Sequence, residues 1–339
     1  MEFVNAYWEE ATVLFYRVIS AVDDLGFSRP WDKAGRSAED PDGSSRQAYE
    51  HFWSDYLPIL IRRRKRWEKV DPRTQPAFLQ RFIHKGVPAP MRRQIWMRNC
   101  APRGPPPPNP VPESVVDAIK LDLPRTFPDN DYVRSEKFMK KLGRTLFVLA
   151  QHVPSVGYCQ GLNFVAGILL LVIQEESQAT DLLVHLVRQR ENYYGSDMHG
   201  LRVDMTVLQK ILRNRVPRVA VTLEKMDVGL DLLIGKWFLC WFVESLPMET
   251  VLRIWDCFIY EGDVWLFRVA VVLIRAHQRE ISDCRSLDQL VLIFQSIGKS
   301  RAALYCHQLL QSAAAEPISQ LFLDELRRES QPHQRGKLK

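Results

Sequence analysis

Two short segments of the chain contain polar side chains that could act together on a charged group. In the first, Asp122 and Arg125 are three positions apart, and in the second Gln160 lies next to Gly161. A guanidinium can stabilise negative charge as it develops, and a carboxamide can both donate and accept a hydrogen bond, as is needed to hold a water molecule. The two segments therefore have the chemistry to assist a reaction at an anionic centre.

Neither segment is specific when it is taken alone. A spacing of three places Asp122 and Arg125 on one face of a helix, where the carboxylate could hold the guanidinium, but the same spacing is typical of surface ion pairs. Gln160 lies between two glycines and precedes a strongly apolar run, so it could equally be a polar residue at a helix start. Both interpretations stay open on these residues alone.

The backbone around Arg125 is expected to leave a helix. Pro124 cannot continue a regular helix because its ring clashes with the carbonyl group four residues earlier. We therefore predict a helix from about Glu113 to Asp122 that ends there, followed by a turn that projects Arg125.

The elements that position these residues are predicted to be helices. The apolar periodicity is helical almost throughout, and no hairpin signal such as Asn-Gly between alternating runs occurs. Residues 135–151, for example, place apolar side chains on one side and lysines on the other. Further helices are predicted at 162–173, 181–190, 205–213, 219–226, 232–245 and 264–279. The sequence therefore predicts an all-α protein.

Breaks in the pattern divide the chain into three parts. We expect an amino-terminal helical extension over 1–80 with a loop at 28–46, a domain over 81–275, and carboxy-terminal helices with a polar tail over 276–339. A short linker is predicted at 71–76. Residues 101–112 hold seven prolines and one glycine, which predicts an exposed, non-helical loop. The basic run at 62–66 is predicted to be a solvated helix face.

The composition limits the class of protein. Hydrophobic residues make up 46% of the 339-residue chain, which favours a folded protein. The six cysteines include no CxxC pair, which favours reduced thiols in the cytoplasm over a disulfide frame or a metal site. The longest apolar run is too short to span a bilayer, and no signal peptide is evident. A net charge of +6 does not demand a nucleic-acid partner.

The two segments belong to a longer series of motifs in a fixed order. The series runs from Gly86 to Gly262 and reads GxPxxxRxxxW, IxxDxxR, YxQGxN, WFxxxF and LPxExxLRIWDxFxxEG. It resembles the TBC family of Rab GTPase-activating proteins, and the resemblance implies a large helical TBC domain of two lobes over 81–275. In that family an arginine finger and a glutamine finger complete the nucleotide site of another protein.

The resemblance implies a function and a partner. The protein would accelerate GTP hydrolysis by a GTP-loaded Rab in trans and so regulate vesicle trafficking, with Arg125 at the phosphates and Gln160 near the attacking water. It would have no GTP hydrolysis site and no cofactor of its own, since GTP and Mg²⁺ are bound by the Rab. A cytoplasmic location, with transient peripheral contact to endomembranes through the Rab, is expected. No nucleic acid and no stable oligomer are implied.

The matching motifs also give supporting roles to other residues. Tyr158 either contacts the GTPase backbone or packs inside, and Asn163 fastens the loop that holds Gln160. Arg92, Arg253 and Asp256 are expected to be buried or groove-lining ion-pair members that hold the finger loops. The supporting set is Asp122, Tyr158, Gly161, Asn163, Arg92, Trp96, Arg253 and Asp256, and Trp96 is expected in the core with Trp237, Trp255 and Phe258.

Two other functions remain open. If Pro124 misdirected Arg125, the chain would be a catalytically silent TBC module that binds Rabs or other trafficking proteins. A scaffold that uses the proline-rich loop and the basic helix face is a third class, and it would survive the loss of both fingers.

Overall fold

The computed structural model describes residues 23, 25–27, 44–71, 76–108, 110–195 and 197–331. All regular structure in these ranges is helical, and no strand occurs there, so the predicted all-α class is confirmed. Several predicted segments lie outside the described residues: the start of the amino-terminal helical extension (1–22), the loop residues 28–43, the linker residues 72–75 and the tail beyond residue 331. The last positions of the predicted 28–46 loop are already helical, because α2 spans Ser44–Trp67.

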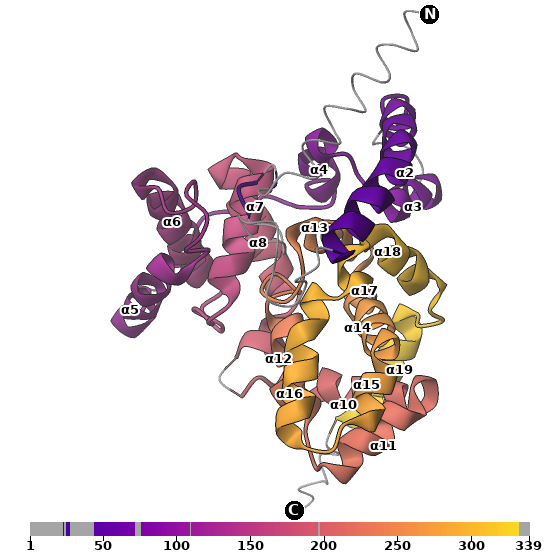
Figure 1. Cartoon of the computed structure of the whole chain (residues 1–339). Coiled ribbons are helices and arrows are strands. Elements are labelled where there is room, and N and C mark those ends of the chain that lie inside the picture. The colour runs from indigo at the N-terminus through magenta and orange to yellow at the C-terminus, as the bar shows by residue number, and fades with distance from the viewer. Residues whose placement is uncertain are drawn as a thin grey trace, which may run out of the picture.

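One lobe is built around an almost completely buried helix. This helix, α7 (Leu162–Ile173), has its predicted bounds, and its sequence, apolar apart from Asn163, is explained by neighbours on several sides. It packs against α4 (Ala89–Trp96), α6 (Glu136–His152) and α8 (Glu176–Arg188), while α5 (Glu113–Asp122) packs on α6. In Figure 1, α5, α6, α7 and α8 lie on the left and α4 lies near the top centre.

The second lobe lies below and to the right in Figure 1. Its centre is α14 (Val264–Ala276), which packs between α13 (Met248–Glu261) and α18 (Cys306–Ala315). The other elements of this lobe are α9 (Glu191–Tyr194), α10 (His199–Arg215), α11 (Pro217–Lys225), α12 (Leu230–Leu239), α15 (Gln278–Asp283), α16 (Leu287–Ser296), η2 (Ile297–Lys299), α17 (Arg301–Leu304) and α19 (Gln320–Ser330).

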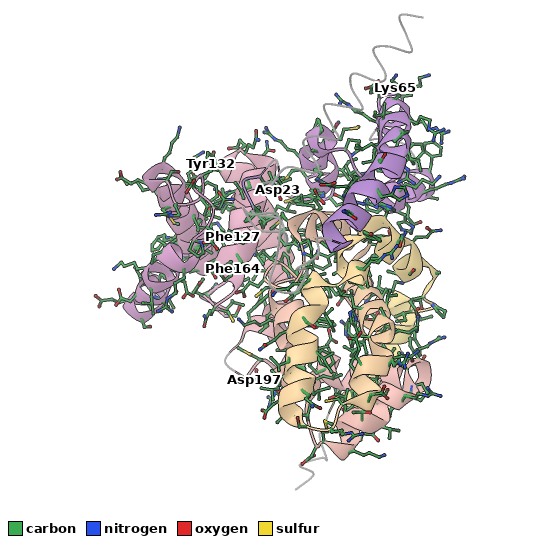
Figure 2. The ribbon with its side chains drawn as sticks, in the orientation of Figure 1. Asp23, Lys65, Phe127, Tyr132, Phe164 and Asp197 are labelled. Atoms are coloured by element: carbon green, nitrogen blue, oxygen red, sulfur yellow. The ribbon has the colours of Figure 1, made fainter. Side chains whose placement is uncertain are left out.

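The helices α2 and α3 (Pro76–Lys85) cover one end of the molecule. Helix α3 packs against α13 and α18, and the indole of Trp67 at the end of α2 donates a hydrogen bond of 2.9 Å to the carbonyl of Gly86. The basic run of α2 is exposed apart from half-buried Arg63, so the predicted solvated helix face is confirmed, and Figure 2 shows Lys65 at the outer edge. One contiguous cluster of buried side chains extends from Trp67 to Leu323 and joins both lobes.

The helices predicted over 181–190 and 205–213 begin earlier than expected, at Glu176 and His199. Two other predicted helices end early for reasons of tertiary structure. The helix predicted over 232–245 ends at Leu239, because buried Trp241 and Phe242 adopt left-handed backbone angles of φ 48° and 68°. The carbonyl of Trp241 there accepts the indole hydrogen bond of Trp255, at 2.9 Å. The helix predicted over 264–279 is divided at His277 into α14 and α15.

Other local predictions are confirmed. Ser135 caps α6, whose predicted apolar face is buried. The described part of the 101–112 loop contains no helix and is mostly exposed. Trp96, Trp237, Trp255 and Phe258 are all buried. Among the described helices, none combines the length and the apolar character needed to cross a membrane.

Candidate functional site

Arg125 lies in a short turn at the end of a helix, as predicted. Helix α5 ends at Asp122, and residues Leu123–Arg125 form the 3₁₀ turn η1. Pro124 is at the start of this turn, where a missing backbone N–H is tolerated. The Arg125 side chain is 62% exposed, so the turn presents the guanidinium to solvent.

Gln160 lies in the tight connection between α6 and α7. Gly157 and Gly161 have backbone angles of φ 59° and 106°, which favour glycine, and the Gln160 side chain between them is exposed. A Cβ atom at Gly161 would lie 2.6 Å from the sulfur of Cys240, so only glycine fits this close approach. The connection is therefore compact and also presents its polar side chain to solvent.

Direct hydrogen bonds join the two segments. The hydroxyl of Tyr158 donates to Oδ2 of Asp122 at 2.7 Å, and Nδ2 of Asn163 donates to Oγ1 of Thr126 at 2.8 Å. Each bond links a residue within three positions of Arg125 with a residue within three positions of Gln160. The fold thus brings Arg125 and Gln160, 35 positions apart in the sequence, onto one connected unit.

Further bonds within each segment fix the connection. Oγ1 of Thr126 donates to the carbonyl of Asp122 at 2.9 Å, and the backbone N–H of Gly161 donates to Oδ1 of Asn163 at 3.0 Å. Asp122, Thr126 and Asn163 are each buried. Because buried polar groups are costly to leave unpaired, this network fixes the two loops in one arrangement.

Asp122 does not hold the Arg125 guanidinium closely. The nearest atoms, Nη1 of Arg125 and Oδ1 of Asp122, are 3.9 Å apart, whereas the Tyr158 hydroxyl is much closer to the carboxylate. Burial, and then the bond to Asp122, raise the pKa of Tyr158, so its hydroxyl remains a donor. The Tyr158 side chain is half-buried with its hydroxyl bonded inward, and the Asp122 carboxylate fastens the loops instead of the guanidinium.

Four other predicted residues form a separate cluster. The completely buried Asp256 accepts hydrogen bonds from Nε of Arg92 at 3.0 Å and from the indole of Trp96 at 3.0 Å. Nη1 of Arg253 lies 3.6 Å from the same carboxylate, and its Nη2 donates to the carbonyl of His84 at 3.0 Å. This cluster fastens α4 and the end of α3 to α13.

The two clusters have different roles in the structure. Asp122, Arg125, Tyr158, Gln160, Gly161 and Asn163 lie together, whereas the hydrogen bonds of Arg92, Trp96, Arg253 and Asp256 lie with the turn between α3 and α4 and with α13. The second cluster reaches the Gln160 loop indirectly, because α4 packs against α7.

Sequence reasoning missed two residues of the site. Thr126 follows Arg125 directly, and a completely buried hydroxyl that links both segments makes it a full member of the network. Its position beside Arg125 was a usable signal. Cys240, which limits the space at Gly161, lies 79 positions away and gave no signal.

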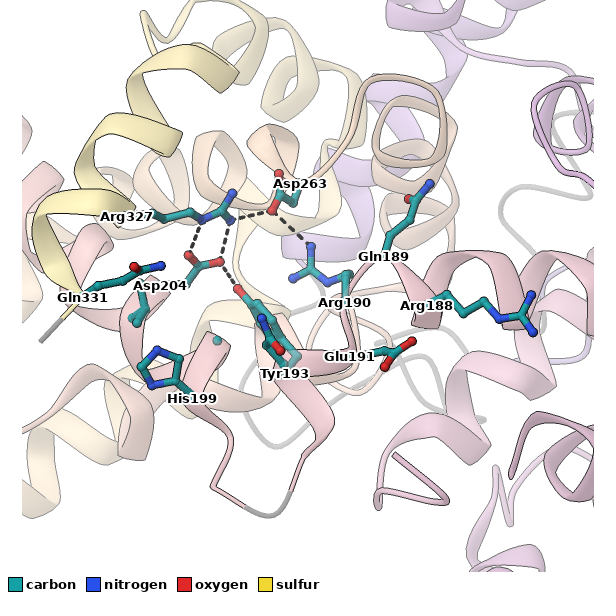
Figure 3. A pocket seen from close by; sticks show the side chains of 13 residues that line it. Arg188, Gln189, Arg190, Glu191, Tyr193, His199, Asp204, Asp263, Arg327 and Gln331 are labelled. Atoms are coloured by element: carbon teal, nitrogen blue, oxygen red, sulfur yellow. Dashed lines mark hydrogen bonds and ion pairs between the residues drawn. The ribbon is translucent and has the colours of Figure 1, made fainter. Parts of the chain in front are cut away.

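A polar cavity of about 310 Å³ lies in the other lobe, apart from Arg125 and Gln160. As Figure 3 shows, Arg327 pairs with Asp204 and Asp263, and Asp263 also pairs with Arg190. Burial opposes ionisation of Asp263, yet the two arginines lower its pKa. These charges balance one another and join α19 to the rest of the lobe, so the arrangement is typical of a structural ion-pair network. Among the described residues, no group of three or more metal-ligating side chains could hold a metal ion.

Comparisons with known proteins give a consistent family. A model described as the Rab-GTPase-TBC domain matches residues 108–282. The chain is 57% identical to growth hormone-regulated TBC protein 6 of Caenorhabditis elegans, over 92% of this chain and 93% of that protein. It is 36% identical to human growth hormone-regulated TBC protein 1, over 89% and 91% respectively.

Solved structures agree with this match. The chain resembles the Chlamydomonas flagellar RabGAP TBC domain with a TM-score of 0.64 and 25% identity, over 86% of this chain and 99% of that one. It resembles the Ypt/Rab-GAP domain of Gyp1p in fold, with a TM-score of 0.62 and 17% identity, over 75% and 97%.

Proposed function

This chain belongs to the Rab-GTPase-TBC domain family, and we propose that it accelerates GTP hydrolysis by a Rab GTPase with Arg125 and Gln160 as its fingers. The single observation that carries the proposal is the hydrogen-bonded unit that presents both exposed side chains together. Groups that are fixed before the reaction stabilise developing charge without paying for reorganisation during it.

Arg125 supplies the cation. Negative charge accumulates on the transferring phosphoryl group, and a guanidinium inserted by a partner protein neutralises it. Such a finger increases the rate by about 10³ to 10⁵, which corresponds to about 4 to 7 kcal/mol. The exposed Arg125 side chain, with only a long contact to Asp122, is available to a partner.

Gln160 supplies the amide. Its carboxamide donates one hydrogen bond and accepts another, so it can orient the water that attacks the phosphoryl group. In this mechanism it takes over from the glutamine of the GTPase itself. GTP and Mg²⁺ are bound by the Rab, and the chain needs no cofactor of its own. Peripheral contact with endomembranes through the Rab follows from the same proposal.

The position of Pro124 supports catalysis over a silent binding module. A silent module was the alternative if Pro124 turned Arg125 away, but the turn η1 leaves the guanidinium exposed beside the Gln160 loop. Pull-down and hydrolysis assays on the wild-type and the Arg125→Ala/Gln160→Ala chains separate the classes. A catalyst accelerates hydrolysis only with both fingers intact, whereas a silent binder retains the GTP-loaded Rab in both forms and accelerates hydrolysis in neither. A scaffold that acts through the proline-rich loop would neither retain the GTP-loaded Rab nor accelerate its hydrolysis of GTP.

The direct test is single-turnover GTP hydrolysis across a panel of Rabs. The wild-type chain is expected to accelerate at least one of them, and Arg125→Ala and Gln160→Ala should each remove most of the acceleration. Arg134→Ala is a matched control, since Arg134 is also 62% exposed and has a partner, Asp131, three positions earlier at 3.7 Å. Acceleration that is unchanged in Arg125→Ala would overturn the proposal.

A further inference from the structure

A short turn near the amino terminus lies against the loop that carries Arg125. Within this turn, Oδ1 of Asp23 accepts hydrogen bonds from the backbone N–H groups of Leu25 and Phe27, at 2.9 and 3.0 Å. The N–H of Asp23 also donates to the carbonyl of Phe27 at 2.9 Å. The turn is therefore closed by its own bonds and offers the Phe27 ring and the Leu25 carbonyl to a neighbour.

That neighbour is the segment directly after Arg125. The rings of Phe27 and Phe127 meet edge to face with centroids 4.8 Å apart, and Phe127 meets Phe164 of α7 in the same way at 5.1 Å. Nδ2 of Asn130 donates to the Leu25 carbonyl at 2.8 Å. Figure 2 shows Asp23, Phe127 and Phe164 close together. Phe127 is thus held between the amino-terminal turn and α7.

Phe127 needs such support because of its backbone. Its φ of 49° lies in the left-handed region, which an aromatic residue rarely adopts and which persists only where packing over-determines it. On the inner side its ring fits against α7 so closely that a Cβ at Gly167 would lie 3.0 Å from it. On the outer side the contact comes from Phe27. Since Phe127 is two positions after Arg125, its placement sets the path of the chain at the finger.

The turn and the loop also fit closely through their polar groups. Asn130 is 1% exposed, and its Oδ1 accepts the N–H of Val133 at 3.1 Å while its Nδ2 reaches the turn. Gly26 has a φ of 87°, and a Cβ there would lie 3.0 Å from the Asn130 amide. The buried Asn130 amide bonded to the turn and the close approach at Gly26 are both typical of a docked turn. A segment that only covers the loop loosely would need neither contact.

We propose that the turn around Asp23–Phe27 is a positioning element for the arginine finger, with Phe27 acting through Phe127. The catalytic unit of this chain then extends well outside residues 108–282, the range that the family model matches. The inference rests on the proposed GTPase-activating function for its kinetic consequences, whereas its structural consequence can be measured without a Rab.

The structural test is hydrogen exchange on the whole chain. In Phe27→Ala, the amides of Thr126 and Asn130, which donate to Leu123 and Phe127 within the loop, should exchange at least about threefold faster, while the centre of α6 is unchanged. Phe27→Tyr, which keeps the ring, should behave like wild type. Phe78→Ala is the matched control, because Phe78 is an exposed phenylalanine on α3. Unchanged loop exchange in Phe27→Ala overturns the inference, whatever the activity.

The kinetic test is single-turnover hydrolysis with a Rab that the wild-type chain accelerates. Because an edge-to-face aromatic pair is lost, the maximal rate should be about two- to tenfold lower with Phe27→Ala than with the wild-type chain. The concentration of the chain that gives half of the maximal rate should be unchanged. In an Arg125→Ala background the same substitution should have no further effect. If only the half-saturating concentration of the chain changed, Phe27 would contribute to Rab binding, and the positioning role would be overturned.

A second variant covers the case in which Phe27→Ala fails to fold. Asn130→Asp keeps the Oδ1 acceptor for Val133 and replaces the donor to Leu25 with a carboxylate oxygen that repels the Leu25 carbonyl, so it should reproduce the faster loop exchange and the lower maximal rate. Full activity of both variants beside an inactive Arg125→Ala would refute this inference alone, and full activity of Arg125→Ala would refute the proposed function instead.

Discussion

Removing the hydroxyl group of Tyr158 should loosen both finger loops at once. In the wild-type chain this hydroxyl donates to Oδ2 of Asp122 at 2.7 Å and lies 3.2 Å from Oδ1 of Asn163. Tyr158→Phe deletes both contacts and leaves the ring in place, so no large cavity forms. The substitution therefore tests the link between the segments and not the packing around it.

The expected magnitude follows from the charge and burial of the acceptor. Asp122 is 6% exposed, and a hydrogen bond to a charged group contributes about 1.5 to 3 kcal/mol. We expect the free energy of unfolding to fall by about 2 kcal/mol in Tyr158→Phe. The maximal single-turnover rate of GTP hydrolysis should fall by roughly tenfold, since about 1.4 kcal/mol corresponds to one factor of ten. This is far less than the loss expected for Arg125→Ala.

Urea unfolding and single-turnover hydrolysis measure the two effects. Tyr132→Phe is the matched control, because it makes the same chemical change on an exposed tyrosine close to the finger loops. Thermal or urea stability and rate should both be unchanged in the control. If Tyr158→Phe is as stable and as active as Tyr132→Phe, the hydrogen bond does not hold the finger loops and the reasoning is refuted.

Two further substitutions have definite expected outcomes. Gly161→Ala should lower both the unfolding free energy, by about 1 to 3 kcal/mol, and the hydrolysis rate, because of its φ of 106° and the nearby Cys240 sulfur; a fully active, fully stable variant would contradict this. Burial, with Arg253 and Arg63, lowers the pKa of His307 to about 3. Below pH 6.5 the unfolded chain binds a proton that the folded chain does not, so stability falls between pH 6.5 and about 3. Urea titrations should show that the free energy of unfolding depends less on pH in His307→Gln than in the wild-type chain. Equal dependence in the two chains would refute this assignment.

Local physical rules predicted much of the site. The clash expected at Pro124 placed the end of α5 at Asp122, where the structure has it, and the strongly apolar run of α7 gave both of its ends. These helix ends are determined by residues that lie within a few positions of them in the sequence. A resemblance in ordered motifs then selected Arg125 and Gln160 from segments that were ambiguous alone.

The features that were missed depend on contacts between distant parts of the chain. The left-handed backbone of Trp241 and Phe242, which ends α12 early, is fixed by burial and by the bond from Trp255. The docking of Phe27 on Phe127 joins positions 100 residues apart. No periodicity or turn rule contains such a pairing, so only the folded structure reveals it.

The most direct test of the central proposal is the ratio of two rates. GTP hydrolysis by a Rab that the wild-type chain accelerates is measured under single-turnover conditions with saturating Arg125→Ala and with saturating Arg134→Ala. The proposal predicts wild-type acceleration with Arg134→Ala and a rate lower by about 10³ or more with Arg125→Ala. Equal rates with the two variants would contradict the assignment of Arg125 as the finger.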